Sequence, residues 1–183
     1  MHRRTFCLMA GASALSACGT APRDVPLPEM ARARALLAAE VARLGRHVDP
    51  QEAVLLANVA YARAAELKRL YQVEDPPLIH NTKVNMGLKP RGLCYHWADD
   101  MEERLRQETF ATLDFHRAIA NSTNWRIEHS TVIVSASGAA MRDGLILDPW
   151  RKGGELTWLA VPDDPDYIWV AREEVFAMRR RQR

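Results

Sequence analysis

The chain has few cysteines, no large excess of charge of either sign and no long apolar run. These features argue against a disulfide framework, a nucleic-acid partner and a membrane-spanning segment, respectively. Its 183 residues contain three cysteines, Cys7, Cys18 and Cys94, too few for a disulfide framework. Its 25 lysines and arginines nearly balance its 23 aspartates and glutamates, so no electrostatic attraction to nucleic acid is expected. The apolar stretch at residues 5–17 is too short to span a bilayer. Nucleic acids are therefore set aside as partners.

The N-terminus has the order of an export signal. Arg3 and Arg4 precede the apolar, small-residue stretch 5–17. The segment Leu15-Ser16-Ala17-Cys18 resembles the lipobox of bacterial lipoproteins. This resemblance implies that residues 1–17 are removed and that Cys18 is acylated, which would anchor the chain to a membrane of the bacterial cell envelope. The alternative is an ordinary secretory signal with an incidental cysteine.

The destination and route of export are less sharply indicated. Gly19 follows Cys18, so the aspartate that retains lipoproteins at the inner membrane is absent, which favours the periplasmic face of the outer membrane. The run Arg3-Arg4-Thr5-Phe6 also resembles part of a twin-arginine signal, so the route stays open. Residues 18–28 are proline-rich and predict a tether. Residues 29–183 have the size of one domain.

The first part of this domain is predicted to be a helical hairpin over residues 29–72. Residues 29–46 are rich in alanine, leucine and arginine and favour a helix. A second helix begins where Asp49 can cap it and Pro50 suits its first turn, and it runs to about Tyr71. The residues expected on or near its buried side are Val54, Leu55, Val59, Ala62, Leu67 and Leu70.

The second part, residues 73–183, predicts a core of one helix and an antiparallel sheet. Prolines and glycines predict a loop over residues 73–92 that forms a wall of a binding cleft. Residues 93–108 favour a helix, and we interpret its acids Asp99, Asp100, Glu102 and Glu103 as a solvated face. Short strands are expected at 110–119, 129–136, 144–150, 155–161 and 167–170, with a last helix at 172–182. Helices followed by an antiparallel sheet make an α+β domain.

Cys94 is the lone cysteine of this domain, and an unpaired thiol in an exported protein is a candidate nucleophile. It stands where the loop after Gly92 becomes a helix, and the N–H groups and dipole of a helix start favour a thiolate. A buried cysteine that acts only as a small hydrophobe is the alternative. A nucleophile needs a base, and the domain offers His47, His80, His96, His116 and His129.

Strand pairing selects His129 among these histidines. His129 begins one predicted strand, and Asp148 ends the next one. If the hairpin between them is centred between Gly138 and Ala139, His129 directly faces Asp148 on the same side of the sheet. A strand-end histidine in solvent and an ordinary turn at Asp148-Pro149 are the alternatives.

These residues together resemble a known enzyme class. Gly92-Leu93-Cys94-Tyr95-His96-Trp97-Ala98 is similar to the G-x-C-x-x-x-A segment of transglutaminase-like and papain-like bacterial cysteine enzymes. His129 at the start of a strand and Asp148-Pro149 at the end of the next one match the family's histidine and aspartate segments in order. The resemblance covers about residues 78–160 and implies the α+β core of that superfamily.

The resemblance implies acyl transfer without a cofactor. Cys94 would attack an amide carbonyl, His129 would take and return the proton, and Asp148 would orient the ring. The Cys94 backbone N–H and Asn85 are the predicted oxyanion donors. Three tryptophans are expected either in the cleft wall or, for at least two of them, in the core: Trp97, Trp125 and Trp150. The expected substrate is an envelope peptide or a cell-wall crosslink.

Two other functions are alternatives to this one. The chain is alternatively a non-catalytic lipoprotein that keeps the fold as a binding or assembly module. A metal site of Cys94, His96 and another histidine is less favoured, because Cys-x-His is not a usual zinc spacing, and no metal is expected. The basic run 179–181 is interpreted as a solvated helix end rather than a contact with lipid or anionic polymer.

Overall fold

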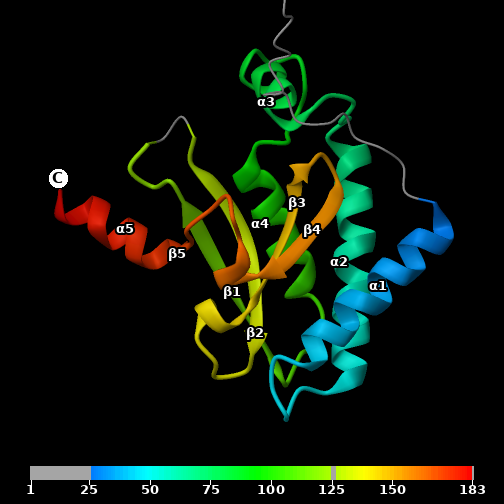
Figure 1. Ribbon diagram of the computed structural model, residues 1–183. Coiled ribbons are helices and arrows are strands. Elements are labelled where there is room, and N and C mark those ends of the chain that lie inside the picture. Colours follow the sequence, from blue (N-terminus) through cyan, green and yellow to red (C-terminus); the bar gives the residue numbers. More distant parts are fainter. Residues whose placement is uncertain (1–25, 125–126, 183) are drawn as a thin grey trace, which may run out of the picture.

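The computed structural model describes residues 26–124 and 127–182, and it confirms an α+β architecture (Figure 1). Five α-helices accompany a five-stranded antiparallel sheet in this part of the chain. The helices are α1 (Leu27–Ala42), α2 (Pro50–Leu70), α3 (Pro77–Asn85), α4 (Cys94–Leu105) and α5 (Arg172–Arg181). The strands are β1 (Leu113–Ala120), β2 (His129–Ala136), β3 (Leu145–Lys152), β4 (Glu155–Ala160) and β5 (Val170–Ala171). Their order across the sheet is β4-β3-β2-β1-β5.

The helical hairpin of α1 and α2 is confirmed, and the start of α2 has the expected cap. The Asp49 carboxylate accepts a 2.7 Å hydrogen bond from the Gln51 N–H, and Pro50 occupies the first turn. Helix α1 begins at Leu27, inside the predicted tether 18–28, because Pro28 is also compatible with a first turn. The predicted signal 1–17 and the predicted acylation site Cys18 lie outside the described residues.

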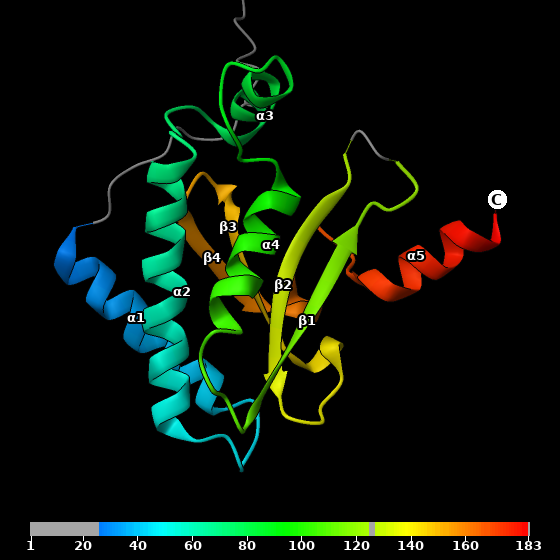
Figure 2. The ribbon, with the colours of Figure 1, turned by 180° about the vertical axis from the view of Figure 1, so that it is seen from behind.

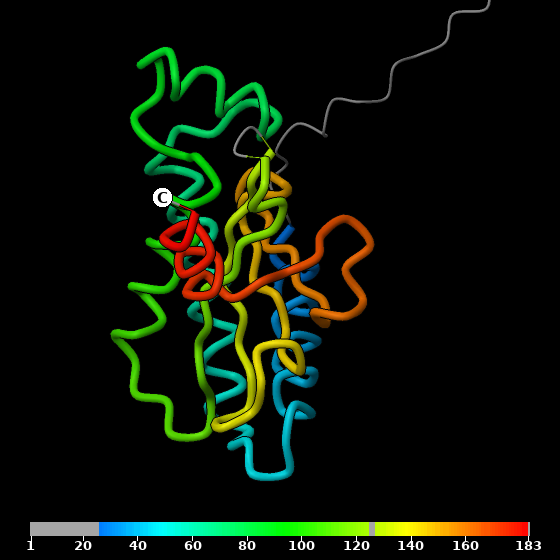
Figure 3. The backbone as a smooth tube through the Cα atoms, turned by 90° about the vertical axis from the view of Figure 1, so that its left-hand side faces the viewer, coloured from blue at the N-terminus to red at the C-terminus, as the bar shows by residue number. Residues whose placement is uncertain are grey.

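The sheet is covered on both faces. Helix α4 packs against β2 and β3 on one face, and α2 packs against α4 and β4, as the reverse view in Figure 2 shows. The other face carries Ile133 and Ile146, which pack with Trp169. Figure 3 shows the segment 161–169 on the side of the sheet opposite α4. Side chains alternate along a strand, so His129 shares this second face with Ile133, and Asp148 shares it with Ile146.

The prediction of a loop over residues 73–92 is wrong in part, because α3 lies within it. Pro76 and Pro77 are the source of the error, since they resemble helix breakers but stand at a helix start, where a missing N–H costs nothing. His80 of α3 is fully buried, so the helix is held against the body of the molecule. The segment that was expected to form a cleft wall as a loop therefore contains a helix.

The acids of α4 are not simply a solvated face. Arg117 of β1 is 3% exposed and forms ion pairs with Asp99 and Glu102. It also donates a 2.9 Å hydrogen bond to the Ser130 hydroxyl. Asp100 accepts hydrogen bonds from the Tyr71 hydroxyl and from Arg91. A buried guanidinium needs such partners, so Asp99 and Glu102 tie α4 to the sheet, while Asp100 ties it to the end of α2 and to the turn before α4.

Among the described residues, no helix is both long enough and apolar enough to cross a membrane.

Candidate active site

Cys94 is held at the start of α4 by a tightly defined turn. Gly92 has a φ of +126°, and its carbonyl accepts a 2.9 Å hydrogen bond from the Trp97 indole. The His96 ring turns back, and its Nδ1 accepts hydrogen bonds from the Gly92 and Leu93 N–H groups at 3.2 and 3.3 Å. His80 adds a 2.9 Å hydrogen bond from Nε2 to the Arg91 carbonyl. These hydrogen bonds hold the backbone of residues 91–93, and so they fix the position from which the Cys94 side chain extends.

This turn predicts a large cost for Gly92→Ala. A Cβ at residue 92 would lie 2.3 Å from Nε2 of the buried His80 ring, and the φ of +126° is itself unfavourable for alanine. We expect a loss of about 2 kcal/mol or more in the free energy of unfolding, measured with urea. Gly87→Ala is the matched control, because Gly87 also has a positive φ, of +73°, but open space around it. Equal losses at the two positions would contradict this account of the turn.

His129 and Asp148 meet as the hairpin argument predicts, although the pairing differs. His129 Nε2 lies 2.6 Å from Asp148 Oδ2, and the two side chains are 2% and 1% exposed. Strand β2 pairs with β3 through Val132 and Leu147, so His129 aligns with residue 150 and Asp148 with Thr131. The predicted hairpin centre was one residue too early. That error shifts pairing by two residues and keeps both side chains on one face, where diagonal neighbours still reach each other.

The Cys94 thiol completes the group. Its sulfur lies 3.6 Å from the Glu128 carbonyl, the residue before His129. The His129 ring uses Nε2 for Asp148, while its Nδ1 is buried without a hydrogen-bond partner among the described residues. The thiol acts on this ring strongly enough to raise its pKa. Nδ1 is therefore the nitrogen available to exchange a proton with Cys94.

The pKa values of His129 and Asp148 are both shifted in the direction that favours the charged form of each side chain. Burial alone would lower the pKa of His129, but the Asp148 carboxylate and the Cys94 thiol outweigh it and raise that pKa to about 9. Burial would likewise raise the pKa of Asp148, but His129 and Arg151 outweigh it and hold that pKa below its usual value. The imidazolium form of His129 is thus stabilised at neutral pH.

Asp148 is itself held by groups that the sequence analysis did not identify. Its Oδ1 accepts hydrogen bonds from the backbone N–H groups of Trp150 and Arg151, at 3.0 and 3.2 Å. Its Oδ2 accepts one from Arg151 Nε at 3.0 Å. The Arg151 guanidinium then makes two hydrogen bonds to Asp164, at 3.1 and 2.7 Å. Because Asp164 lies beyond β4, no local sequence pattern links it to Asp148.

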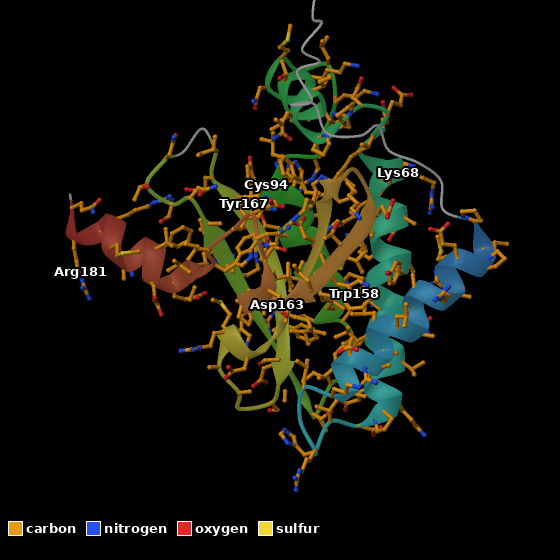
Figure 4. The ribbon with its side chains drawn as sticks, viewed as in Figure 1. Lys68, Cys94, Trp158, Asp163, Tyr167 and Arg181 are labelled. Carbon is orange, nitrogen blue, oxygen red and sulfur yellow. The ribbon has the colours of Figure 1, made fainter. Side chains whose placement is uncertain are left out.

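An aromatic box surrounds the His129 ring. The ring centroid lies 4.6 Å from that of Trp150, 4.7 Å from that of Tyr167 and 5.4 Å from that of Trp169. In Figure 4, Cys94 and Tyr167 are drawn at the same end of the sheet. Tyr167 lies in the predicted strand 167–170, but the strand found there, β5, covers Val170–Ala171 and leaves Tyr167 free to cover the site. These rings exclude water from the imidazole and limit its rotation.

The three tryptophans predicted for the cleft or the core have different places. Trp150 contacts His129 and lies at the site. Trp97 is 1% exposed and packs edge-on against Tyr71, with centroids 4.8 Å apart, so it belongs to the core and not to a cleft. Trp125 lies outside the described residues.

A pocket of about 320 Å³ opens beside the thiol. It is lined by Asn81, Asn85, Leu93, Cys94, Tyr95, Glu128 and Ser130, from α3, the start of α4 and the start of β2. Asn85 is thus near the thiol, as expected.

Arg179 of α5 forms an ion pair with Glu128 and donates a 3.0 Å hydrogen bond to the Ser122 carbonyl, so this arginine is not merely part of a solvated tail.

Within the described ranges 26–124 and 127–182, no group of three histidine, cysteine, aspartate or glutamate side chains is arranged to hold a metal ion. His96 in particular has Nδ1 occupied by two backbone N–H groups.

The geometry is therefore that of a thiol, an imidazole and a carboxylate in sequence, with a pocket of mixed polar and apolar lining beside the thiol. Comparisons of the chain with models of protein families, with curated proteins and with solved structures find no match.

Proposed function

We propose that the protein is a thiol-dependent acyl-transfer enzyme that hydrolyses or transamidates a peptide or other amide. The observation that carries this proposal is the buried 2.6 Å contact of His129 Nε2 with Asp148, which leaves Nδ1 for Cys94. Among the described residues, His80 is also buried with an unpartnered Nδ1, but its Nε2 bonds a backbone carbonyl, whereas His129 has a carboxylate on Nε2 and a thiol that helps to raise its pKa. We also propose that the fold is a transglutaminase-like or papain-like core, because the cysteine, histidine and aspartate segments follow one another along the chain in the order found in that superfamily.

Each residue has one role in the proposed reaction. His129 holds the proton of Cys94 as an imidazolium, and the thiolate sulfur forms a bond to the substrate carbonyl carbon. The departing amine receives the proton from His129, which leaves a thioester on Cys94. Water, or a second amine in a transamidation, then attacks the thioester and restores the thiol. Asp148 keeps the ring oriented and stabilises its charged form, and Arg151 fixes Asp148.

We further propose that the enzyme is lipid-anchored in the bacterial envelope through Cys18 and acts on an envelope peptide or a cell-wall crosslink. The support is the leader 1–17 and the lipobox-like segment that ends in Cys18. Metabolic labelling with a fatty-acid probe tests this anchor, because Cys18→Ala should lose the label and Cys7→Ala should keep it.

The reactivity of Cys94 towards iodoacetamide tests the proposed chemistry. We expect alkylation at pH 7 to be at least about tenfold faster than that of glutathione, because His129 and the helix start stabilise the thiolate. His129→Ala should remove this excess rate. His116→Ala is the matched control, since His116 bonds the Ser135 hydroxyl at 2.8 Å, away from the thiol, and should react like the wild type.

Peptide mass spectrometry of the labelled chain keeps Cys7 and Cys18 out of the measurement. A Cys94 that reacts no faster than glutathione would contradict the proposal and favour a non-catalytic binding module.

A further inference from the structure

Asn81 on α3 has an amide whose orientation is determined by one neighbour. The indole Nε1 of Trp150 lies 3.1 Å from Asn81 Oδ1. An indole nitrogen only donates, so the atom of Asn81 that faces Trp150 must be the oxygen. The amide NH₂ of Asn81 is therefore on the other side of the group. Asn81 also lines the pocket that contains Cys94.

Trp150 links this amide to the proposed base. The same side chain stacks on the His129 ring, with centroids 4.6 Å apart, and donates to Asn81. One indole therefore positions both the proposed base and an amide of the pocket beside Cys94. A donor that is fixed before the reaction stabilises developing charge without a cost of reorganisation.

The predicted donor Asn85 lacks such a support. It lies one helical turn after Asn81 and lines the same pocket, but its side chain is exposed. No hydrogen bond from another described residue holds its amide. A donor that must be ordered during the reaction contributes less than one that is already in place.

We infer that Asn81 Nδ2, together with the Cys94 backbone N–H, binds the oxyanion of the acyl-transfer reaction, and this inference rests on the proposed function. When the Cys94 thiolate bonds to the carbonyl carbon, the π electrons move to the oxygen, which becomes the negative atom of a tetrahedral intermediate. The His96 ring accepts from the Gly92 and Leu93 N–H groups at the start of α4, whereas the Cys94 N–H stands in the first turn, where backbone N–H groups have no acceptor within the helix. The intermediate collapses when the electrons return and the leaving group departs with the proton from His129.

The experiment compares two reactions of Cys94 in the same variants of the full chain. Hydrolysis of p-nitrophenyl acetate passes through an oxyanion, whereas alkylation by iodoacetamide does not. Asn81→Ala should lower kcat/KM for the ester about a hundredfold and leave the alkylation rate within about twofold. Asn81→Asp keeps the acceptor for Trp150 and replaces the NH₂ by oxygen, so it should lower ester hydrolysis at least as much, while its negative charge beside the thiolate also slows alkylation. Thr82→Ala, a neighbour on α3 whose hydroxyl bonds the Leu78 carbonyl, is the matched control and should change neither reaction.

Trp150→Phe separates the orientation of Asn81 from the packing of the pocket. It keeps an aromatic ring on His129 but removes the indole N–H, so it should lower ester hydrolysis more than alkylation.

The outcomes distinguish this inference from the proposed function. Rapid alkylation and ester hydrolysis that persist in both Asn81 variants, or that depend on Asn85 instead, would overturn the inference alone. Equal losses of alkylation and hydrolysis in Asn81→Ala would also overturn it, since they would indicate a disturbed thiol. A wild-type protein without Cys94-dependent ester hydrolysis would overturn both.

Discussion

Asp148→Asn is expected to reduce Cys94-dependent ester hydrolysis by about three to four orders of magnitude. The structure predicts the direction in which the new amide will lie. Oδ1 of Asp148 accepts from two backbone N–H groups, and Oδ2 accepts from the Arg151 side chain. The backbone donors cannot turn away, whereas the Arg151 guanidinium can keep its bonds to Asp164, so the carbonyl oxygen of asparagine is expected at the Oδ1 position. Its NH₂ group then faces His129 Nε2, where the carboxylate oxygen had been.

This arrangement would reverse the tautomer of His129. Nε2 would have to accept a hydrogen bond, so the ring proton would move to Nδ1, which faces the thiol and could no longer take its proton. The charged imidazolium would also lose its carboxylate partner. Both effects act on the base and leave the sulfur in place.

The measurement is kcat/KM for p-nitrophenyl acetate, with the urea midpoint recorded for each variant. Asp143→Asn is the matched control, because it makes the same change at a carboxylate that is 65% exposed. A folded Asp148→Asn protein with nearly wild-type activity would show that the amide turns its oxygen to His129, and it would contradict the assigned role of Oδ1.

The stability of the protein is expected to fall as pH rises from about 6.5 to about 9. The pKa of His129 is raised to about 9 in the folded chain, above the value of 6.5 for an unperturbed histidine. The folded state therefore holds a proton that the unfolded state releases in this interval. The contribution is fully present below pH 6.5 and is lost as pH rises through 9. It corresponds to about 3 kcal/mol.

The acid side of the profile has the opposite sign. The pKa of Asp148 is lowered in the folded chain, so its contribution is present above the pKa of an unfolded aspartate and is lost as pH falls through the lowered value. Maximum stability is thus expected between about pH 4 and pH 6.5.

Urea unfolding at a series of pH values from 4 to 10 measures this profile. His129→Asn should lower stability and flatten the alkaline decline, because the titrating ring is gone. An equally steep decline in that variant would assign the effect to another group and contradict the His129–Asp148 pairing as its cause.

Local patterns predicted the elements that depend on nearest neighbours along the chain. The Asp49-Pro50 start of α2 is an example, because a cap and a first turn are made by adjacent residues. The same holds for β2, which begins at His129 as predicted. The buried face of α2 was predicted in part: Val59 and Leu67 are buried as expected, but Val54 and Leu70 are 51% and 57% exposed. The alanines Ala53 and Ala60 are buried instead. Alanines let α1 and α4 approach closely, and hydrophobicity alone does not reveal this.

The pairing of His129 with Asp148 was predictable for a reason that tolerates error. A shift of the hairpin centre by one residue moves the register by two, and a period of two keeps each side chain on its face. The error in the centre arose because the turn between β2 and β3 includes a short 3₁₀ helix at Met141–Asp143. Face was therefore determined by the sequence, whereas the exact neighbour was not.

The sequence by itself determined the lone thiol of the domain, the order of Cys94, His129 and Asp148, and the face of the sheet on which the last two lie. Only the tertiary structure decided what surrounds them: the Arg151–Asp164 pair behind Asp148, the rings of Tyr167 and Trp169, and the amide of Asn81 beside the thiol. The physical reason is that these groups come from α3 and from the segment after β4, which meet the site only when the sheet is covered on both faces. Contacts between distant segments depend on packing, and no periodicity in one segment encodes its partner in another.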